Sequence, residues 1–371
     1  MRLAFYAPLK PPDHPTPSGD RLMAGLLVRA LGAAGHEVQI ASSLRTYSAS
    51  PAGGDYRLLR AAAEEEAARL IAMWSQPGAS VPDGWFTYHP YFKAPDWIGP
   101  AVCARFGLPY LTAEASYAGK RDAGPWGPWQ ADVAVALRQS AANFCFTPVD
   151  REGLERLGLS PDTLVDLPPF IEPPAFPAKP RRSTAAPRIA VVAMMRFGDK
   201  VASYLMLSAA LQTLVDLPWR LAVMGDGPAR GDVLAAFAPL PADRIDWLGE
   251  VEPETVAAEL SACDLYVWPG TGEAYGLAYL EAQAMGLPVV AQDTAGVPAV
   301  VENAVSGLLT PAGDVAALAH AIRGLLGEPE LRLGMGGAAS RFVRERRSVA
   351  SAAAILDAAL TRIAAQGRIA S

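Results

Sequence analysis

The sequence predicts an α/β protein of two domains, each with a parallel β-sheet covered by helices. The chain has 371 residues, more than a single domain usually holds. Short apolar segments alternate with Ala- and Leu-rich stretches of helical periodicity, which is typical of parallel α/β layers. Seven prolines lie between Pro168 and Pro187, and a stretch so rich in proline interrupts helices and central strands alike.

The first domain is expected over residues 1–167. Its apolar segments predict strands at Arg2–Ala7, Glu37–Ser42, Pro109–Ala113 and Asn143–Thr147. The first helix is predicted to begin at Ser18-Gly19-Asp20, because Ser or Asp can cap a helix start. Gly19 would let backbone N–H groups approach a ligand there.

Residues 168–187 are interpreted as a linker, and the second domain is expected over 188–347. Strands are predicted at Arg188–Met194, Trp219–Met224, Asp246–Leu248, Asp264–Trp268 and Pro288–Ala291. A last helix is predicted over Ser348–Gln366. Its apolar stripe recurs at helical spacing and must be buried against another element; its members are Val349, Ala352, Ile355, Leu356 and Leu360.

The composition narrows the class of protein. The formal charge of −6 provides no global basic field to attract nucleic acid. Cys103, Cys145 and Cys263 are far apart in apolar surroundings, so buried thiols are expected instead of disulfides. The start of the chain has one positive charge and is predicted to be a buried strand, not a signal peptide. A soluble, cytoplasmic protein is therefore predicted, with peripheral membrane contact left open.

The segment Pro269–Ala291 contains the most informative motif, in the order strand, Gly-rich loop, helix, strand. The helix is expected to begin at about Tyr275, so its free N–H groups and positive dipole end would suit a diphosphate. Glu281, deeper in the helix, can accept both hydroxyls of a ribose, and Glu273 in the loop can reach a sugar. The alternative is that both glutamates are solvated surface groups.

Two cations follow the first strand of the second domain. Arg196 and Lys200 lie at a strand–helix junction and suit a leaving diphosphate, although each could also be an ordinary surface cation. The later turn Gly225-Asp-Gly-Pro228 could contact a ligand, or could need glycine only for its backbone conformation.

Together, these motifs make the second domain resemble the retaining GT-B glycosyltransferases of family four, the glycosyltransferase group 1 class. The spacing from Glu273 to Glu281 matches the E-x7-E element of that family. The other matching segments are Gly225–Pro228, Trp247–Val251, Gly286–Ala291, Gly296–Glu302, Ser306–Leu309, Ala312–Leu318 and Glu328–Arg332.

The resemblance implies the GT-B fold, two Rossmann-like domains with a cleft between them, and a last helix (348–371) that crosses back onto the first domain. It implies transfer of a sugar from a UDP- or GDP-sugar to a saccharide or glycoconjugate acceptor, with retention, as in polysaccharide biosynthesis. The implied catalytic residues are Glu273, His89, Arg196 and Lys200. The implied donor-binding residues are Gly19, Arg196, Lys200, Val251, Glu273, Ala274, Tyr275, Gly276, Leu277 and Glu281.

No cofactor and no metal are expected, since fixed cations and a helix end replace a metal ion in the resembled fold. The chain also contains no Asp-x-Asp pair to hold a divalent ion. His89, at a predicted strand end in the first domain, has a catalytic role or a structural one. His36 is expected to be structural.

The acceptor side is less well specified. Residues 74–129 contain 12 of the 30 aromatic residues, and the segment Gly124–Trp129 is interpreted as a loop with two tryptophans. These rings either bind a saccharide or pack among themselves. The first domain departs from the family pattern, so a non-catalytic nucleotide-sugar-binding protein with a degenerate acceptor domain is the alternative function. A GT-B epimerase or phosphorylase has no positive support.

Overall fold

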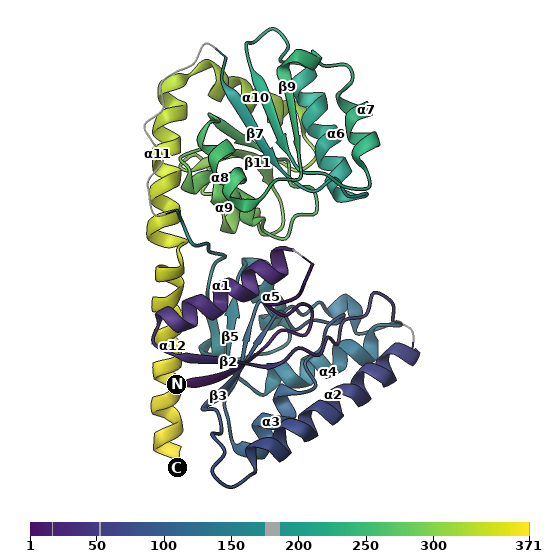
Figure 1. Ribbon diagram of the computed structural model, residues 1–371, viewed down its shortest axis with the longest axis vertical. Coiled ribbons are helices and arrows are strands. Elements are labelled where there is room, and N and C mark those ends of the chain that lie inside the picture. The colour runs from purple at the N-terminus through teal and green to yellow at the C-terminus, as the bar shows by residue number, and fades with distance from the viewer. Residues whose placement is uncertain (17, 52, 175–185, 371) are drawn as a thin grey trace. The chain divides into compact units, whose positions relative to one another are not determined.

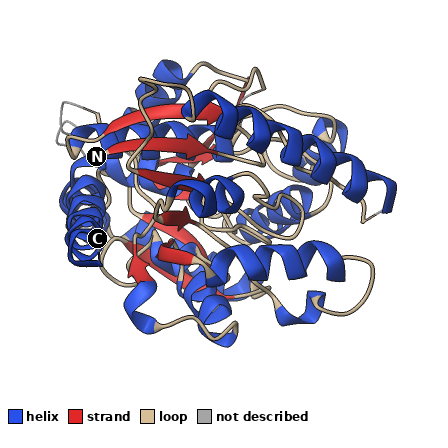
Figure 2. Ribbon diagram, turned by 90° about the horizontal axis from the view of Figure 1, so that it is seen from below, coloured by secondary structure: helices blue, strands red, loops and turns tan. Residues whose placement is uncertain are grey.

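The computed structural model describes residues 1–16, 18–51, 53–174 and 186–370. The chain forms two compact units. Unit 1 consists of Met1–Pro168 and Val349–Ser371, and unit 2 of Pro169–Ser348. Each unit has one six-stranded parallel sheet with helices packed on it (Figures 1 and 2). Of the predicted linker 168–187, residues 175–185 lie outside the described residues.

The sheet of unit 1 has the strand order β2-β1-β3-β4-β5-β6. Its strands are β1 (Arg2–Tyr6), β2 (Glu37–Ser42), β3 (Gly84–Tyr88), β4 (Tyr110–Ala113), β5 (Ser140–Cys145) and β6 (Leu164–Asp166). Its helices are α1 (Gly19–Ala33), α2 (Gly53–Trp74), α3 (Gly99–Phe106), α4 (Gly127–Arg138), α5 (Pro148–Arg156) and α12 (Val349–Ala370). Every residue of β3 and β4 is buried, as expected for parallel strands covered on both faces.

Helix α12 packs along α1. Leu356 and Leu360 are fully buried, and Val349 and Ala352 nearly so, whereas Ile355 is only half-buried. Over Val349–Gln366, α12 is the one helix among the described residues that is long and apolar enough to cross a membrane by length and composition. Its packing against α1 accounts for this apolar stripe.

The sheet of unit 2 has the strand order β12-β11-β10-β7-β8-β9. Its strands are β7 (Arg188–Val192), β8 (Arg220–Met224), β9 (Ile245–Gly249), β10 (Leu265–Val267), β11 (Val289–Asp293) and β12 (Gly307–Pro311). Its helices are α6 (Asp199–Gln212), α7 (Arg230–Phe237), α8 (Pro253–Ser261), α9 (Leu277–Ala284), α10 (Val315–Gly327) and α11 (Pro329–Arg346). Helix α6 packs beside α7 and α10, and α9 beside α8 and α11.

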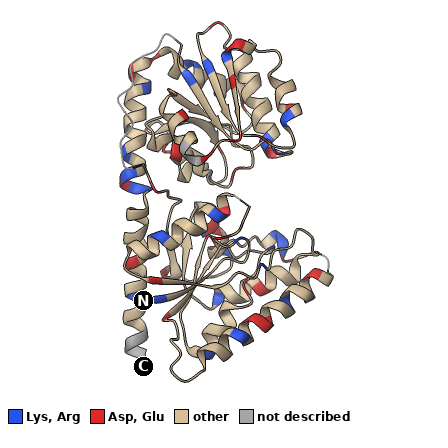
Figure 3. Cartoon of the chain, in the orientation of Figure 1, with Lys and Arg blue, Asp and Glu red and all other residues tan. Residues whose placement is uncertain are grey.

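The α/β class and its parallel sheets are confirmed, and most predicted strands differ from the observed ones only at their ends. The exception is the segment predicted as Asn143–Thr147, which is displaced to Ser140–Cys145. Thr147 instead caps α5, where its hydroxyl accepts from the N–H of Asp150 at 3.2 Å. Charged residues of both signs lie along outer helices such as α2 (Figure 3).

Candidate functional site

The strand order places a switch point in unit 2 between β7 and β10. The sheet grows to one side through β8 and β9 and to the other through β11 and β12. Because crossovers are right-handed, the helices that follow β7 and β10 lie on opposite faces of the sheet, and the loops after these strands separate at its edge. In open α/β sheets ligands bind at this position. The loop after β7 contains Arg196, and the loop after β10 contains Glu273.

The loop that contains Arg196 is held by the Gly225-Asp-Gly-Pro turn. The N–H of Met195 donates to the carbonyl of Asp226 at 2.8 Å, and the N–H of Ala193 donates to that of Met224 at 3.0 Å. Gly225 and Gly227 have φ of +146° and +152°, and a Cβ at Gly225 would collide with the carbonyl oxygen of Ala193. The glycines are therefore explained by close backbone packing, and this packing positions the Arg196 loop.

Lys200 and Glu273 form an ion pair between the first turn of α6 and the loop after β10. The ammonium of Lys200 also lies 5.5 Å from the ring centroid of Trp268, within cation–π range. The indole Nε1 of Trp268 donates to Glu273 Oε2 at 3.4 Å. Two predicted site residues from distant parts of the chain are thus brought together at the switch point.

The Gly-rich loop before α9 is wrapped around Tyr279. Gly270 and Gly276 have φ of +76° and +79°, and a Cβ on either would collide with the Tyr279 side chain. The hydroxyl of Tyr279 donates to the carbonyl of Trp268 at 3.0 Å, which fixes the ring. Helix α9 begins at Leu277, two residues later than predicted, because Gly276 adopts a conformation that a helix does not allow. No side chain caps this helix, and the N–H of Tyr279 donates to Gly276 O at 3.2 Å, so among the described residues the N–H groups of Leu277 and Ala278 are the ones available to an anion.

Glu281 lies in the second turn of α9 and is half-buried. Burial raises the pKa of its carboxyl above the ordinary value. Burial also raises the pKa of the Tyr266 hydroxyl, with further contributions from the charges of Glu273 and then Glu281. Both glutamates of the E-x7-E element therefore lie within electrostatic range of one buried phenol.

The remaining predicted residues of unit 2 are less tightly connected. Arg196 is exposed, and among the described residues its side chain makes no hydrogen bond or ion pair. Val251 is half-buried and follows the end of β9 by two residues. Ala274, Tyr275, Gly276 and Leu277 form the turn into α9. The structure thus groups Lys200, Glu273 and the start of α9, while Arg196 lies in the loop after β7 and Val251 in the loop after β9.

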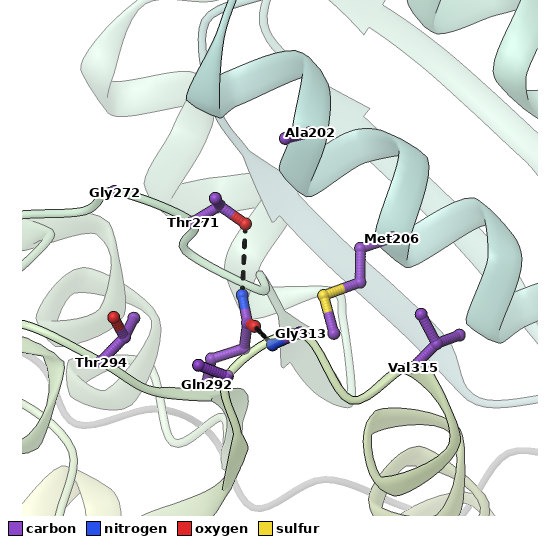
Figure 4. Close-up of a pocket in the computed structure, with 9 residues that line it drawn as sticks. Ala202, Met206, Thr271, Gly272, Gln292, Thr294, Gly313 and Val315 are labelled. Atoms are coloured by element: carbon purple, nitrogen blue, oxygen red, sulfur yellow. Dashed lines mark hydrogen bonds between the residues drawn. The ribbon is translucent and has the colours of Figure 1, made fainter.

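A pocket of about 330 Å³ lies beside the Gly-rich loop and is lined by α6, by β11, by the loops after β10, β11 and β12, and by the first residue of α10 (Figure 4). The amide Nε2 of Gln292 donates to Pro269 O at 3.1 Å and to Thr271 Oγ1 at 3.2 Å, and its Oε1 accepts from the N–H of Gly313. None of the predicted donor residues lines this pocket. Gln292 instead ties the loop after β10 to the loop after β12, and so supports the loop that contains Glu273.

Unit 1 has its own switch point, between β1 and β3. Gly19 begins α1 after the β1 loop, with the Ser18 side chain as its cap, and His89 directly follows β3. His89 Nδ1 lies 3.0 Å from Oδ1 of Asp20 and 4.0 Å from Oε1 of Glu114. The predicted residues Gly19 and His89 are therefore neighbours through Asp20.

Asp20 and Glu114 were missed by the analysis of the sequence as functional residues. Glu114 directly follows β4, which lies beside β3 in the sheet. The carboxyl ends of neighbouring parallel strands lie at one edge of the sheet. A carboxylate directly after β4 and a histidine directly after β3 could therefore have been predicted to lie close together.

The pKa values of His89 and Glu114 both lie well above the ordinary values of these side chains. Burial alone would lower the pKa of His89, but the charge of Glu114, and the hydrogen bond and charge of Asp20, outweigh it and raise the pKa to about 9. Burial raises the pKa of the Glu114 carboxyl to about 7, although the charge of His89 acts in the opposite direction. A cluster of perturbed groups at a switch point is a candidate functional site.

The aromatic segment of unit 1 is mostly explained by packing. The interpretation of Gly124–Trp129 as a loop was wrong for its second half, because α4 begins at Gly127 and buries Trp129, which is 1% exposed. Trp126 packs on Phe92 at 5.0 Å and on Trp129 at 5.5 Å between ring centroids. His36 is structural as expected, since its Nδ1 lies 3.2 Å from the N-terminal nitrogen of Met1.

In the described parts of the chain, no group of three or more His, Cys, Asp or Glu side chains is placed to hold a metal ion. The predicted absence of a metal requirement stays a prediction, since it concerns turnover.

Comparison with known proteins matches residues 186–328 to the family described as glycosyl transferases group 1. D-inositol 3-phosphate glycosyltransferase of Geodermatophilus obscurus is 32% identical over 198 residues, 49% of this chain and 44% of that protein. Alpha-D-kanosaminyltransferase of Streptomyces kanamyceticus is 25% identical over 280 residues, 72% of each chain. This chain spans about half the length of several curated relatives that it matches.

Two solved structures share the fold of the whole chain. Sucrose-phosphate synthase from Thermosynechococcus elongatus has a TM-score of 0.72 at 19% identity and covers 100% of both chains. HepE from Anabaena, solved in complex with UDP, has a TM-score of 0.68 at 14% identity over 98% of this chain and 100% of that one. The domain formed by residues 186–328 therefore belongs to the glycosyl transferases group 1, and the chain as a whole has the GT-B fold.

Proposed function

We propose that this protein transfers a sugar from a nucleotide-diphosphate sugar to a saccharide or glycoconjugate acceptor, with retention and without a metal ion. The observation that carries the proposal is the Lys200–Glu273 ion pair at the switch point of unit 2, beside the uncapped start of α9. Fixed positive charge next to free N–H groups is the combination that stabilises a leaving diphosphate.

Four of the predicted site residues of unit 2 have a role in this proposal. The ammonium of Lys200 and the guanidinium of Arg196 neutralise the diphosphate, together with N–H groups at the start of α9. Glu281 accepts hydrogen bonds from the ribose hydroxyls. Glu273 is held by Lys200 and Trp268 where a donor sugar would follow the diphosphate.

The acceptor is assigned to unit 1, where His89 lies at the second switch point. The proposed transfer of a sugar is supported by two relatives whose names describe such a transfer. One of them aligns with 72% of this chain. The UDP in the HepE complex supports a uridine or related nucleotide for the donor.

The alternative is a nucleotide-sugar-binding protein without catalysis. No relative described above has such a function, and the residues predicted to handle the diphosphate are all present. A cytoplasmic location and a role in polysaccharide biosynthesis remain predictions, as does peripheral membrane contact.

The proposal is tested in two steps. A thermal-shift panel of UDP-, GDP- and ADP-sugars identifies the donor, because a ligand that binds only the folded state raises the melting temperature. Release of the nucleoside diphosphate from that donor is then measured in EDTA, with and without a panel of saccharide acceptors. We expect slow release alone and faster release with an acceptor. Binding without any release would instead support the non-catalytic alternative.

A further inference from the structure

The switch point of unit 1 holds a group of charged side chains that the proposed donor site does not use. We propose that Asp20 and Glu114 are positioning residues for His89, whose catalytic role the family resemblance already implies: they hold its ring as a cation that can donate a hydrogen bond from Nε2 to an oxygen of the sugar substrate. The second half of this inference rests on the proposed function, whereas the first half does not.

The backbone directs His89 and Glu114 to the same edge of the sheet. His89 follows β3 with φ of +58°, and Glu114 follows β4 with φ of +53°. The N–H of His89 donates to Ala113 O at 2.8 Å, and the N–H of Glu114 donates to Phe144 O at 2.9 Å. Non-glycine residues rarely adopt positive φ, and such strained positions cluster at functional sites. The two residues directly follow adjacent strands, and their side chains meet beside Asp20 at the start of α1.

The side chains then form one connected group. Asp20, in the first turn of α1, contacts His89 Nδ1, and Glu114 approaches the same nitrogen from β4. The hydroxyl of Tyr88 donates to Glu114 Oε2 at 2.9 Å and fixes that carboxylate. The His89 ring stacks on Tyr91 with centroids 4.8 Å apart. Because stacking on Tyr91 fixes the plane of the ring and the contact with Asp20 fixes the position of Nδ1, the direction in which Nε2 points is also fixed.

Every element packed around His89 contributes a group that bears on its charge. Asp20 comes from α1, Glu114 from the end of β4 and Asp150 from α5, and all three favour the protonated ring. Tyr91 is neutral, because burial raises the pKa of its hydroxyl well above the ordinary value. Burial alone would raise the pKa of the Asp20 carboxyl, but the hydrogen bond and charge of His89, with a smaller contribution from the charge of Lys10, lower it. Negative charge therefore outweighs positive charge around the ring.

This arrangement indicates a substrate contact instead of a purely structural ion pair. A buried ion pair gains little over well-packed apolar side chains of the same size, so stability alone explains the group poorly. The His89 side chain is still 19% exposed, and among the described residues no hydrogen bond reaches Nε2. Because carboxylates surround the imidazolium, the site disfavours an anionic ligand and suits a neutral sugar hydroxyl, which can accept from Nε2.

The first half of the inference is tested without any activity. The chain has four histidines, and in a protein labelled with ¹³C at histidine Cε1 the His89 signal is identified by its loss in His89→Gln. We expect His89 to titrate near pH 9 in the wild type and to move toward about 6.5 in Asp20→Asn and in Glu114→Gln. Glu64→Gln, which removes an exposed carboxylate from α2, should leave the titration unchanged. Titration near 6.5 in the wild type would overturn the inference.

The second half is tested by the pH dependence of kcat/KM for the donor and acceptor found above. Asp20→Asn and Glu114→Gln should retain most activity at pH 6, where His89 is protonated in every variant. They should lose at least tenfold at pH 8, where only the wild type and Glu64→Gln keep the cation. An equal loss at both pH values would mean that the two carboxylates act only on structure. If no nucleotide sugar is turned over at all, the proposed function fails, and the titration still decides whether Asp20 and Glu114 hold His89.

Discussion

Lys200 and Glu273 are 73 positions apart in the chain, and their side chains form an ion pair at the switch point of unit 2. Lys200 is placed by the start of α6, and Glu273 by a loop whose glycines fold around Tyr279. Each charge is fixed by the other and by Trp268. Preorganised charges need no rearrangement when negative charge develops on a leaving group, which is why such a pair serves diphosphate departure.

Replacement of Lys200 by alanine tests this relationship. The change removes the cation from the diphosphate and leaves Glu273 without its counter-charge. We expect kcat/KM for the nucleotide sugar to fall about 10- to 150-fold, which corresponds to about 1.5–3 kcal/mol for a charged hydrogen bond. Steady-state kinetics measure the effect. The matched control is Arg323→Ala, which removes an exposed cation on α10 that pairs with Asp216. This variant should leave kcat/KM unchanged.

Replacement of Glu281 by alanine tests the ribose contact. Loss of a hydrogen-bonded carboxylate should weaken donor binding by about 1–3 kcal/mol, while the fold survives because the side chain is only half-buried. Isothermal titration calorimetry with the nucleoside diphosphate measures the change, and Glu330→Gln on α11 serves as the control. Equal affinity of Glu281→Ala and the wild type would remove Glu281 from the site.

The raised pKa of His89 predicts how stability depends on pH. The folded-state pKa of about 9 exceeds the ordinary value of 6.5, so the stabilisation is fully present below pH 6.5 and is lost as the pH rises through 9. A difference of 2.5 units (9 minus 6.5) corresponds to about 3 kcal/mol at most. The melting temperatures of the wild type and His89→Gln should therefore converge between pH 6.5 and 9. A constant gap across this range would contradict the linkage.

Truncation after Arg347 tests the packing of α12. Removal of this helix uncovers the face of α1 on which it lies, so unit 1 should expose apolar surface and aggregate, while unit 2 stays folded. Size-exclusion chromatography and limited proteolysis measure the two outcomes. The double variant Leu356→Ser/Leu360→Ser should weaken unit 1 in the same direction, because both leucines are fully buried. A truncated chain that remained monomeric and active would show that unit 1 does not need α12.

Much of the fold could be predicted from the sequence because parallel α/β layers leave a strong pattern. Apolar runs such as Glu37–Ser42 coincide with strands, and Ser18 caps α1 as its side chain allows. The start of α9 was placed two residues early, because the conformation of Gly276 depends on its contact with Tyr279 three residues later. The short strand β6 has only three residues and no distinct pattern.

The candidate site was predictable in unit 2 and only partly so in unit 1. Glu273 and Glu281 belong to a motif with fixed spacing, and Lys200 follows a predicted strand at a strand–helix junction, so the sequence alone points to all three. Asp20 and Glu114 belong to no motif, and they meet His89 only because α1, β3 and β4 end at one edge of the sheet. The prediction of a loop over Gly124–Trp129 was wrong from Gly127 onward. The Gly- and Pro-rich composition of the segment favoured a loop, but α4 begins there and tertiary packing buries Trp129.

The most direct test of the central claim is ¹H NMR of the donor during turnover in EDTA, with the nucleotide sugar and acceptor identified by the panels. We expect that the anomeric signal of the donor decays in the wild type, that the first product has the same anomeric configuration, and that Lys200→Ala slows the decay. A donor that binds yet remains unconsumed, a first product of opposite configuration, or turnover that requires added manganese or magnesium would contradict it.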